Sequence, residues 1–183
     1  MKARHTVQAA RPGTARARHQ APEREVREHI IDWLREAYAM EKGLEAYLKK
    51  VTTKDQVSHL VKTAATAHLE ETRRHAEVVK AMLETLGSDT SALKTGVGMM
   101  AQATKGLGTM FASDEQIKDL LDAYSMEHFE IASYTALAAA AESAGLEQVA
   151  QMCRSIIPQG EQMAQRLLEN LPSEVQAYLA STD

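Results

Sequence analysis

The chain has 183 residues, a length that fits one domain with an ample core. Only 4% of its residues are aromatic, and Ala, Glu, Leu, Lys, Gln and Met dominate, so the composition predicts an all-α protein. A single cysteine, Cys153, excludes an internal disulfide. No apolar run is long enough to span a bilayer or serve as a signal peptide, which predicts a cytoplasmic protein with no membrane partner.

The net charge of −4 is unevenly distributed along the chain. Residues 1–24 carry six Lys or Arg and one acid, whereas the rest carries 15 basic and 24 acidic residues. Because this basic segment has almost no large apolar side chains, we predict a disordered tail over 1–24 and a folded domain over 25–183. Such a tail could bind nucleic acid through its charge, or it could be a solvated leader without a partner.

The first two helices follow from apolar residues at helical spacing. One is predicted over roughly residues 23–50, and its apolar stripe is interrupted near the centre by Glu41. The second is predicted over roughly 54–86, ending before Gly87, a residue type that favours helix C-termini.

Residues 87–113 form a long connection rich in glycine and apolar side chains, too long and too apolar for an ordinary surface loop. A connection of this length could return along the bundle and place the helices on either side of it parallel. One long crossover of this kind is typical of ferritin-like bundles, whereas plain up-and-down bundles use short loops.

The second half of the chain predicts two long helices and a short one. A capping pattern at Ser113 opens a helix that ends at Ala144, and a short turn leads into a helix over about 146–171, with a kink at Pro158. A last short helix follows over about 173–179. The predicted fold is therefore an all-α, ferritin-like antiparallel four-helix bundle with a long crossover between its second and third helices and a short C-terminal helix.

Polar side chains interrupt the apolar faces of three of these helices. At about 100° per residue, Glu71 and His75 fall within about 60° of His68, among apolar neighbours. Glu127 and Glu130 repeat this pattern in the third long helix. The complete set is Glu41, His68, Glu71, His75, Glu127 and Glu130.

Burying an unpaired carboxylate is unfavourable unless it is protonated, hydrogen-bonded or bound to a cation, and helical bundles hold metals with inward Glu and His. Four carboxylates and two imidazoles suit iron or manganese, and zinc fits less well. The alternative is that the glutamates lie at helix edges or in ion pairs, and that the histidines donate to backbone carbonyls. The hydroxyls of Tyr38, Tyr124 and Tyr134 are expected to hydrogen-bond the carboxylates.

Several sequence blocks resemble the bacterial YciE and YciF family of ferritin-like stress proteins, and YciE more closely. The resemblance covers roughly residues 29–180. It rests on Asp32-Trp33-Leu34-Arg35, Ala39-Met40-Glu41-Lys42, His68-Leu69-Glu70-Glu71-Thr72, Phe111 to Glu115, Glu127 to Tyr134 and Gln162-Met163-Ala164. The resemblance implies a ferritin-like fold, a di-metal centre and a dimer, with Glu41, His68, Glu71, Glu127 and Glu130 as ligands.

The chain departs from the usual ferritin-like ligand pattern at two places. The residue three after Glu71 is Arg74 rather than His, and the fourth helix has Gln159-Gly160 where an inward Glu is expected. Two functions remain open. One is a metal-dependent stress protein that handles iron, peroxide or oxygen with oxidase-like or peroxidase-like chemistry. The other is a non-catalytic scaffold that has lost tight metal binding. We expect a homodimer or larger assembly in either case.

Overall fold

The computed structural model describes residues 13–54, 57, 59–90 and 115–181, and four long helices account for nearly all of them. In chain order these helices are α1 (Gly13–Thr53), α2 (His59–Thr85), α4 (Glu115–Ser143) and α5 (Glu147–Ala180). No strand occurs within the described ranges. The predicted all-α class is confirmed.

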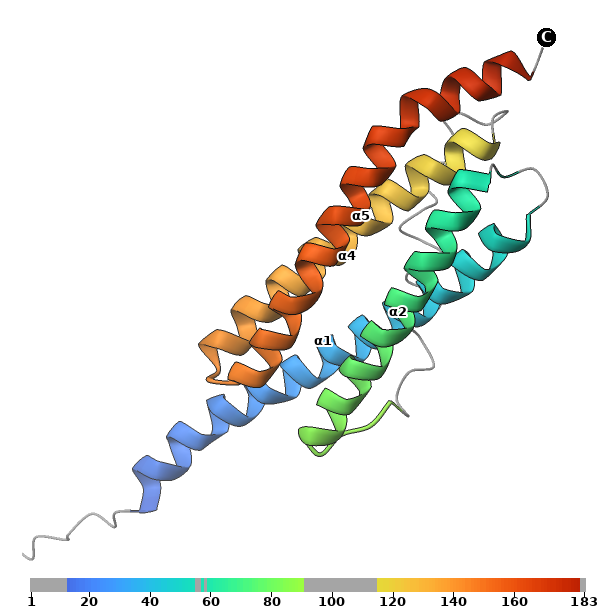
Figure 1. Cartoon of the computed structure of the whole chain (residues 1–183). Helices are drawn as coiled ribbons and strands as arrows, with labels where there is room; N and C mark the ends of the chain where they lie inside the picture. The colour runs from blue at the N-terminus through green and yellow to red at the C-terminus, as the bar shows by residue number, and fades with distance from the viewer. Residues whose placement is uncertain (1–12, 55–56, 58, 91–114, 182–183) are drawn as a thin grey trace, which may run out of the picture.

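The four helices form one bundle in which each neighbour runs antiparallel (Figure 1). α1 packs mainly against α2 and α4 mainly against α5, and the two pairs meet through α1 with α4 and α2 with α5. α2 and α4 run in the same direction, as expected for a bundle with one long crossover. This confirms the ferritin-like topology, although the crossover residues 91–114 lie outside the described residues.

The ends of α2 and α4 are set by glycines in the left-handed backbone region. Gly87 has a φ of 73° and Gly145 a φ of 68°, conformations that other residues rarely adopt. The amide after each glycine donates to the carbonyl five residues earlier. These pairs are Ser88 with Leu83 at 2.9 Å and Leu146 with Ala141 at 2.8 Å.

Two helix starts differ from the sequence expectation. α1 begins at Gly13, about ten residues before the predicted start, because alanine, arginine and glutamine favour continued helix, and this part projects beyond the bundle (Figure 1). α2 begins at His59 rather than near residue 54. Residues 13–24 of the tail predicted to be disordered therefore belong to α1, whereas residues 1–12 lie outside the described part. The tail's contact with nucleic acid and the domain boundary at 24/25 stay predictions.

The predicted short C-terminal helix is wrong, because α5 is a single helix from Glu147 to Ala180. It contains both Pro158 and Pro172, each of which removes only one backbone donor. The hydroxyl of Ser173 does not open a new helix. It donates instead to the carbonyl of Asn170 at 2.8 Å, so the local capping pattern is overridden by helix continuation.

The buried interior consists of two apolar clusters along the bundle axis. The first cluster includes Ile30, Leu34, Val79, Leu83 and Tyr134, together with buried residues of α5. The second cluster contains Leu44, Leu48, Val51, Val57, Ala65, Leu69 and Met126. On α1 and α4, Glu41 and the pair Glu127 and Glu130 lie between residues of the two clusters, and His75 does so on α2. His68 and Glu71 lie within two turns of His75, so a polar layer crosses the middle of the bundle.

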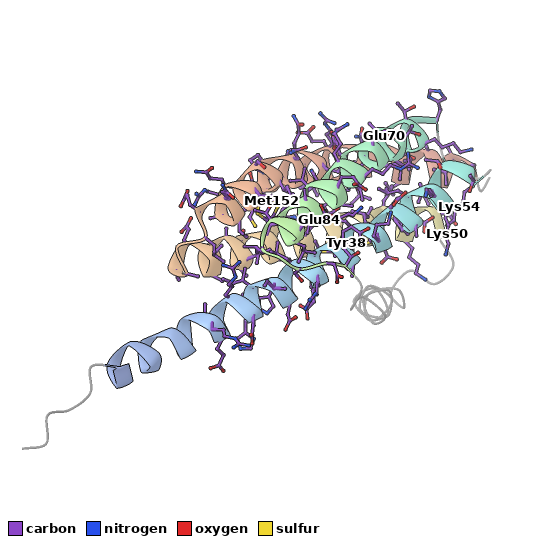
Figure 2. All side chains as sticks on the ribbon, turned by 90° about the horizontal axis from the view of Figure 1, so that it is seen from below. Tyr38, Lys50, Lys54, Glu70, Glu84 and Met152 are labelled. Atoms are coloured by element: carbon purple, nitrogen blue, oxygen red, sulfur yellow. The ribbon has the colours of Figure 1, made fainter. Side chains whose placement is uncertain are left out.

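Charged side chains cover the outside of the bundle, as the labelled Lys50, Glu70 and Glu84 illustrate (Figure 2). Met152 on α5 is buried in the first cluster. None of the described helices is both long enough and apolar enough to cross a membrane.

Candidate metal centre

Five side chains of the polar layer are almost fully buried. α1 contributes one, α2 contributes two histidines and α4 contributes two glutamates. Their exposed fractions are 0% for Glu41, 4% for His68, 4% for His75, 1% for Glu127 and 2% for Glu130. Helical periodicity brings them together because each lies on the inward face of its helix, between the two apolar clusters.

The buried donors form two groups that share one carboxylate. Glu41, His75 and Glu130 form the first group, and His68, Glu127 and Glu130 form the second. In each group, one donor atom from every residue lies within 4.8 Å of the others. Glu130 therefore occupies the position from which a carboxylate could contact two ions.

Burial is the main influence on the carboxylate of Glu41. It raises the pKa of Glu41 well above the usual range, and the nearby Glu130 raises it further. The hydroxyl of Tyr134 donates to Glu41 Oε1 at 2.6 Å and partly opposes this shift. Burial also raises the pKa of Glu127, against the opposing effect of His68. Both carboxyl groups therefore hold a proton more tightly than they would in water.

His68 lies between two carboxylates. Its Nε2 is 2.7 Å from Glu127 Oε1, and its Nδ1 is 3.5 Å from Glu71 Oε2. Burial lowers the pKa of His68, but the neighbouring carboxylates of Glu127, Glu130 and Glu71 together outweigh it and the net shift is upward. Without a metal, a proton on His68 would thus offset the charge of Glu127.

His75 has its tautomer set by α5. Gln159 Nε2 donates to the carbonyl of Ser155 at 2.8 Å, which turns Gln159 Oε1 toward His75 Nε2 at 3.3 Å. Because an amide oxygen only accepts, Nε2 carries the hydrogen, and in the neutral ring Nδ1 has a free lone pair. That Nδ1 lies 3.4 Å from Glu130 Oε1 and 3.7 Å from Glu41 Oε1. Three acceptor atoms therefore face one another.

The polar layer leaves most of its buried atoms without hydrogen-bond partners. Apart from His68 Nε2, which is 2.7 Å from Glu127 Oε1, the buried side-chain atoms without a hydrogen bond among the described residues are Glu41 Oε2, His68 Nδ1, Thr72 Oγ1, His75 Nδ1, Glu127 Oε2 and both oxygens of Glu130. Leaving a buried polar group unsatisfied costs about 1–3 kcal/mol, and more if it is charged. Cations would satisfy this set of oxygen and imidazole donors, so the residues fit a metal centre.

The structure places Glu71 differently from the other predicted ligands. Its side chain is 27% exposed and it belongs to neither of the two groups, so it lies at the edge of the layer. Thr72, which the sequence reasoning missed, is fully buried instead. The signal was present, because Thr72 lies about 40° from His68 on the helix, closer than Glu71 at about 60°. The predicted contact of a tyrosine with the carboxylates is realised by Tyr134.

α5 approaches the layer closely but supplies no carboxylate. A Cβ added at Gly160 would lie 3.7 Å from Glu127 Oε2 and 3.1 Å from Ile131 Cγ1. The polar contribution of this helix is Gln159, whose contact with His75 depends on the tertiary arrangement. The departure seen in the sequence therefore places a neutral amide on the fourth side of the layer.

The class of fold is a ferritin-like four-helix bundle. Neighbouring helices run antiparallel, α2 and α4 run parallel to each other, and a layer of Glu and His points inward. Residues 25–180 match the family described as a domain of unknown function, DUF892. The chain belongs to this family. The resemblance to YciE and YciF drawn from the sequence blocks is confirmed.

Solved structures with the same fold include proteins from several bacterial species. A protein of Xanthomonas campestris pv. campestris is 35% identical, with a TM-score of 0.72, covering 86% of this chain and 98% of that one. The stress protein YciF of Escherichia coli is 23% identical, with a TM-score of 0.65 and coverages of 82% and 97%. The bacterioferritin-related protein of Bacteroides fragilis, described as a dodecameric thioferritin, is 15% identical, with a TM-score of 0.66 and coverages of 84% and 90%.

Proposed function

We propose that this protein is a metal-binding ferritin-like stress protein of the cytoplasm whose polar layer holds two iron or manganese ions. The observation that carries the proposal is the orientation of His75. Its Nδ1 lone pair faces the carboxylate oxygens of Glu41 and Glu130, an arrangement that is repulsive unless a cation or a proton lies between them. The hydrogen bond from His75 Nε2 to Gln159 assigns the only proton of the neutral ring to the far side.

Each residue of the layer then has a defined role. Glu41 and His75 would hold one ion, His68 and Glu127 would hold the other, and Glu130 would contact both. The bound metals would supply redox chemistry toward small oxidants. Tyr134 keeps the Glu41 carboxylate in place by donating to Oε1, and the apolar clusters on both sides limit the access of water. Glu71, at the edge of the layer, would accept a hydrogen bond from His68 Nδ1 and so orient the imidazole.

Protons would occupy the layer in the absence of metal. Burial favours a protonated Glu41, and Glu127 favours a protonated His68. Metal ligands must be deprotonated, so binding would release protons and would weaken as the pH falls. Metal would thus replace protons bound to these carboxyl and imidazole groups.

The proposal is tested by titrating metal-free protein with Mn²⁺ or, without oxygen, Fe²⁺, and by following heat and proton release in two buffers of different ionisation enthalpy. We expect saturable binding near two ions per chain, with protons released. Absence of binding at micromolar concentrations would favour the non-catalytic scaffold, which is also supported by α5 contributing no carboxylate to the polar layer.

We further propose that the protein forms a homodimer or larger homo-oligomer. Val26 and Trp33, seven residues apart on one face of α1, are 43% and 44% exposed. Large apolar side chains that recur on one helix face are typical of interfaces. Light scattering should give a mass above that of one chain, and Trp33→Lys should reduce it. A monomer at micromolar concentration would contradict the proposal.

A further inference from the structure

A second feature of the bundle is a cavity of about 60 Å³ that is separate from the first apolar cluster. Residues of all four long helices line it, from His68 and Glu127 at mid-bundle to Val51, Asp119 and Asn170. Along each helix these positions run toward the bundle end where α1 finishes and α2 begins (Figure 1). The cavity therefore leads from that end of the bundle to the polar layer.

The walls of this cavity are mainly apolar. Leu44, Leu48, Ala123 and Met163 are among them. Two polar residues also line the walls: the hydroxyl of Tyr47 already donates to the carbonyl of Asp119 at 3.0 Å, and Arg166 is an exposed residue of α5. A buried water needs two to four polar partners, which the walls do not provide. A charged molecule would lose its hydration without compensation. The volume is well below the ~150 Å³ of a cavity known to hold benzene, so the lining favours a neutral apolar molecule of a few heavy atoms.

The cavity reaches only one half of the polar layer. Among the described residues, its lining includes His68 and Glu127 but not Glu41, His75 or Tyr134. Tyr134 packs instead within the first apolar cluster, on the far side of the layer. A molecule in the cavity would therefore contact the His68 imidazole while the opposite half stays enclosed.

We propose that a small neutral apolar molecule binds in this cavity against His68 and Glu127, so that the layer is entered from one side. The site itself does not depend on metal. Only the meeting of this molecule with an ion at His68 and Glu127 rests on the proposed function. A small apolar substrate would then reach the layer at the half formed by His68, Glu127 and Glu130.

Xenon is a suitable probe, because it is apolar and occupies cavities that stay free of water. The experiment uses metal-free protein with labelled methionine methyl groups and histidine rings, and follows NMR shifts with xenon pressure. Met163 lines the cavity, whereas Met152 lies in the first cluster on the same helix and is the matched control. We expect saturable shifts for Met163 and His68, and no saturable shift for Met152 or His75.

Ala123→Leu should fill the cavity and abolish the saturable shift of Met163. Ala132→Leu, the same change at an exposed position of α4, should leave that shift intact. Ala64→Leu, which fills the cavity from α2, replaces the first variant if that variant does not fold.

A linear response shared by Met152 and Met163, equal shifts of both histidines, or a saturable shift that persists in the filled variants would overturn the proposal. Because no metal is present, these outcomes are independent of the metal titration. Xenon binding without metal affinity would support the cavity and reject the metal centre, and metal binding without xenon binding would do the reverse.

Discussion

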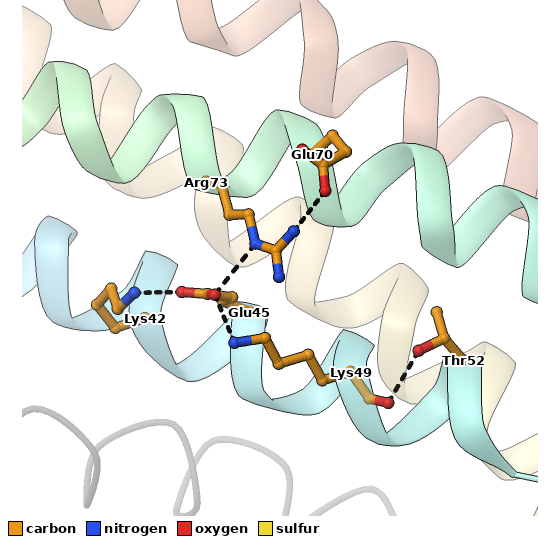
Figure 3. A network of polar contacts seen from close by, with 6 residues as sticks. All are labelled: Lys42, Glu45, Lys49, Thr52, Glu70 and Arg73. Atoms are coloured by element: carbon orange, nitrogen blue, oxygen red, sulfur yellow. Dashed lines mark hydrogen bonds and ion pairs between the residues drawn. The ribbon is translucent and has the colours of Figure 1, made fainter.

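Glu41 and Glu45, one turn apart on α1, have opposite pKa shifts because their surroundings differ. Glu45 is buried, but Lys42, Lys49 and Arg73 surround its carboxylate, as Figure 3 shows. The hydrogen bonds from Lys42 and then Lys49 lower the pKa of Glu45 to about 2. Glu41 is buried more deeply and has no such partner, so its pKa rises well above the usual range.

Glu45 shows that a buried carboxylate in this bundle can be neutralised by Lys and Arg side chains of the same chain. In the part of the chain that the structure describes, Glu41, Glu127 and Glu130 form no ion pair with Lys or Arg. The basic groups nearest to them are histidines, which in the neutral form can bind metal. We therefore interpret the polar layer as a binding site for cations from solution. The contacts around Glu45 form a structural ion-pair network.

The largest effect is expected from Glu130→Gln, because Glu130 belongs to both donor groups. A metal present at 100 times its dissociation constant stabilises the folded state by about 2.7 kcal/mol per site. At roughly 2–4 °C per kcal/mol, the unmodified protein should gain several degrees in Tm from Mn²⁺. Glu130→Gln should lose most of that gain in differential scanning fluorimetry.

Two neighbouring substitutions calibrate this result. Glu70→Gln, on the exposed face of α2, should keep the full gain, and Glu71→Gln, at the edge of the layer, should lose only part of it. Equal gains in the unmodified protein and Glu130→Gln would place the metal elsewhere.

Gln159→Leu should weaken metal binding by about 10- to 100-fold, the usual effect of removing a partner that orients a ligating histidine. Without the amide oxygen, His75 could carry its hydrogen on Nδ1 and present it to Glu41 and Glu130. Calorimetric titration measures the change. Gln162→Leu, on the exposed face of the same helix, is the control. Equal metal affinities in the two variants would show that Gln159 does not orient His75.

Gly160→Glu should supply the carboxylate that α5 lacks and tighten metal binding by about tenfold. A side chain there starts 3.7 Å from Glu127 Oε2, so without metal the added carboxyl group should lower Tm by like-charge repulsion. Gly160→Ala separates this effect from the gain in helix propensity and from the close contact with Ile131. Weaker binding in Gly160→Glu than in Gly160→Ala would show that this position does not face the ions.

The smallest effects are in the pH dependence of metal-free stability. Glu45 has a lowered pKa, so its stabilisation is present above the unfolded value of 4.5 and is lost as the pH falls toward about 2. Glu41 has a raised pKa, so its destabilising effect grows as the pH rises above 4.5. Glu45→Gln should cost about 1 kcal/mol at neutral pH, because its partners are partly exposed.

Urea unfolding at several pH values measures these contributions. The cost of Glu45→Gln should shrink toward pH 2, and Glu41→Gln should become more stabilising as the pH rises. Glu36→Gln, at an exposed position of the same helix, should change neither slope. Parallel slopes for Glu41→Gln and Glu45→Gln would mean that the two carboxylates are not distinguished by their surroundings.

Helical periodicity predicted most of the fold and five of the six layer residues at their buried positions. It worked because an amphipathic helix fixes which residues point inward, whatever the partner helix is. It failed at α5, where the capping pattern at Ser173 predicted a break that the packed helix does not make. Local signals of this kind are worth about 1 kcal/mol and are overridden by continued helix formation.

The different electrostatic surroundings of the buried glutamates were not predictable from the sequence. Glu41 and Glu45 are both glutamates of one helix, and only the approach of Arg73 from α2 and the side-chain paths of Lys42 and Lys49 distinguish them. The role of Gln159 likewise depends on how α5 packs against α2. Contacts between helices, rather than spacing along one helix, determine which carboxylates remain without a positive partner.

The most direct test of the account is the metal content of protein purified without a histidine tag, measured by elemental analysis beside Glu130→Gln and Glu70→Gln. The account predicts iron or manganese approaching two ions per chain in the unmodified protein and in Glu70→Gln, and a marked loss in Glu130→Gln. No transition metal above the level of Glu130→Gln, even after reconstitution with Fe²⁺ and Mn²⁺, would contradict it.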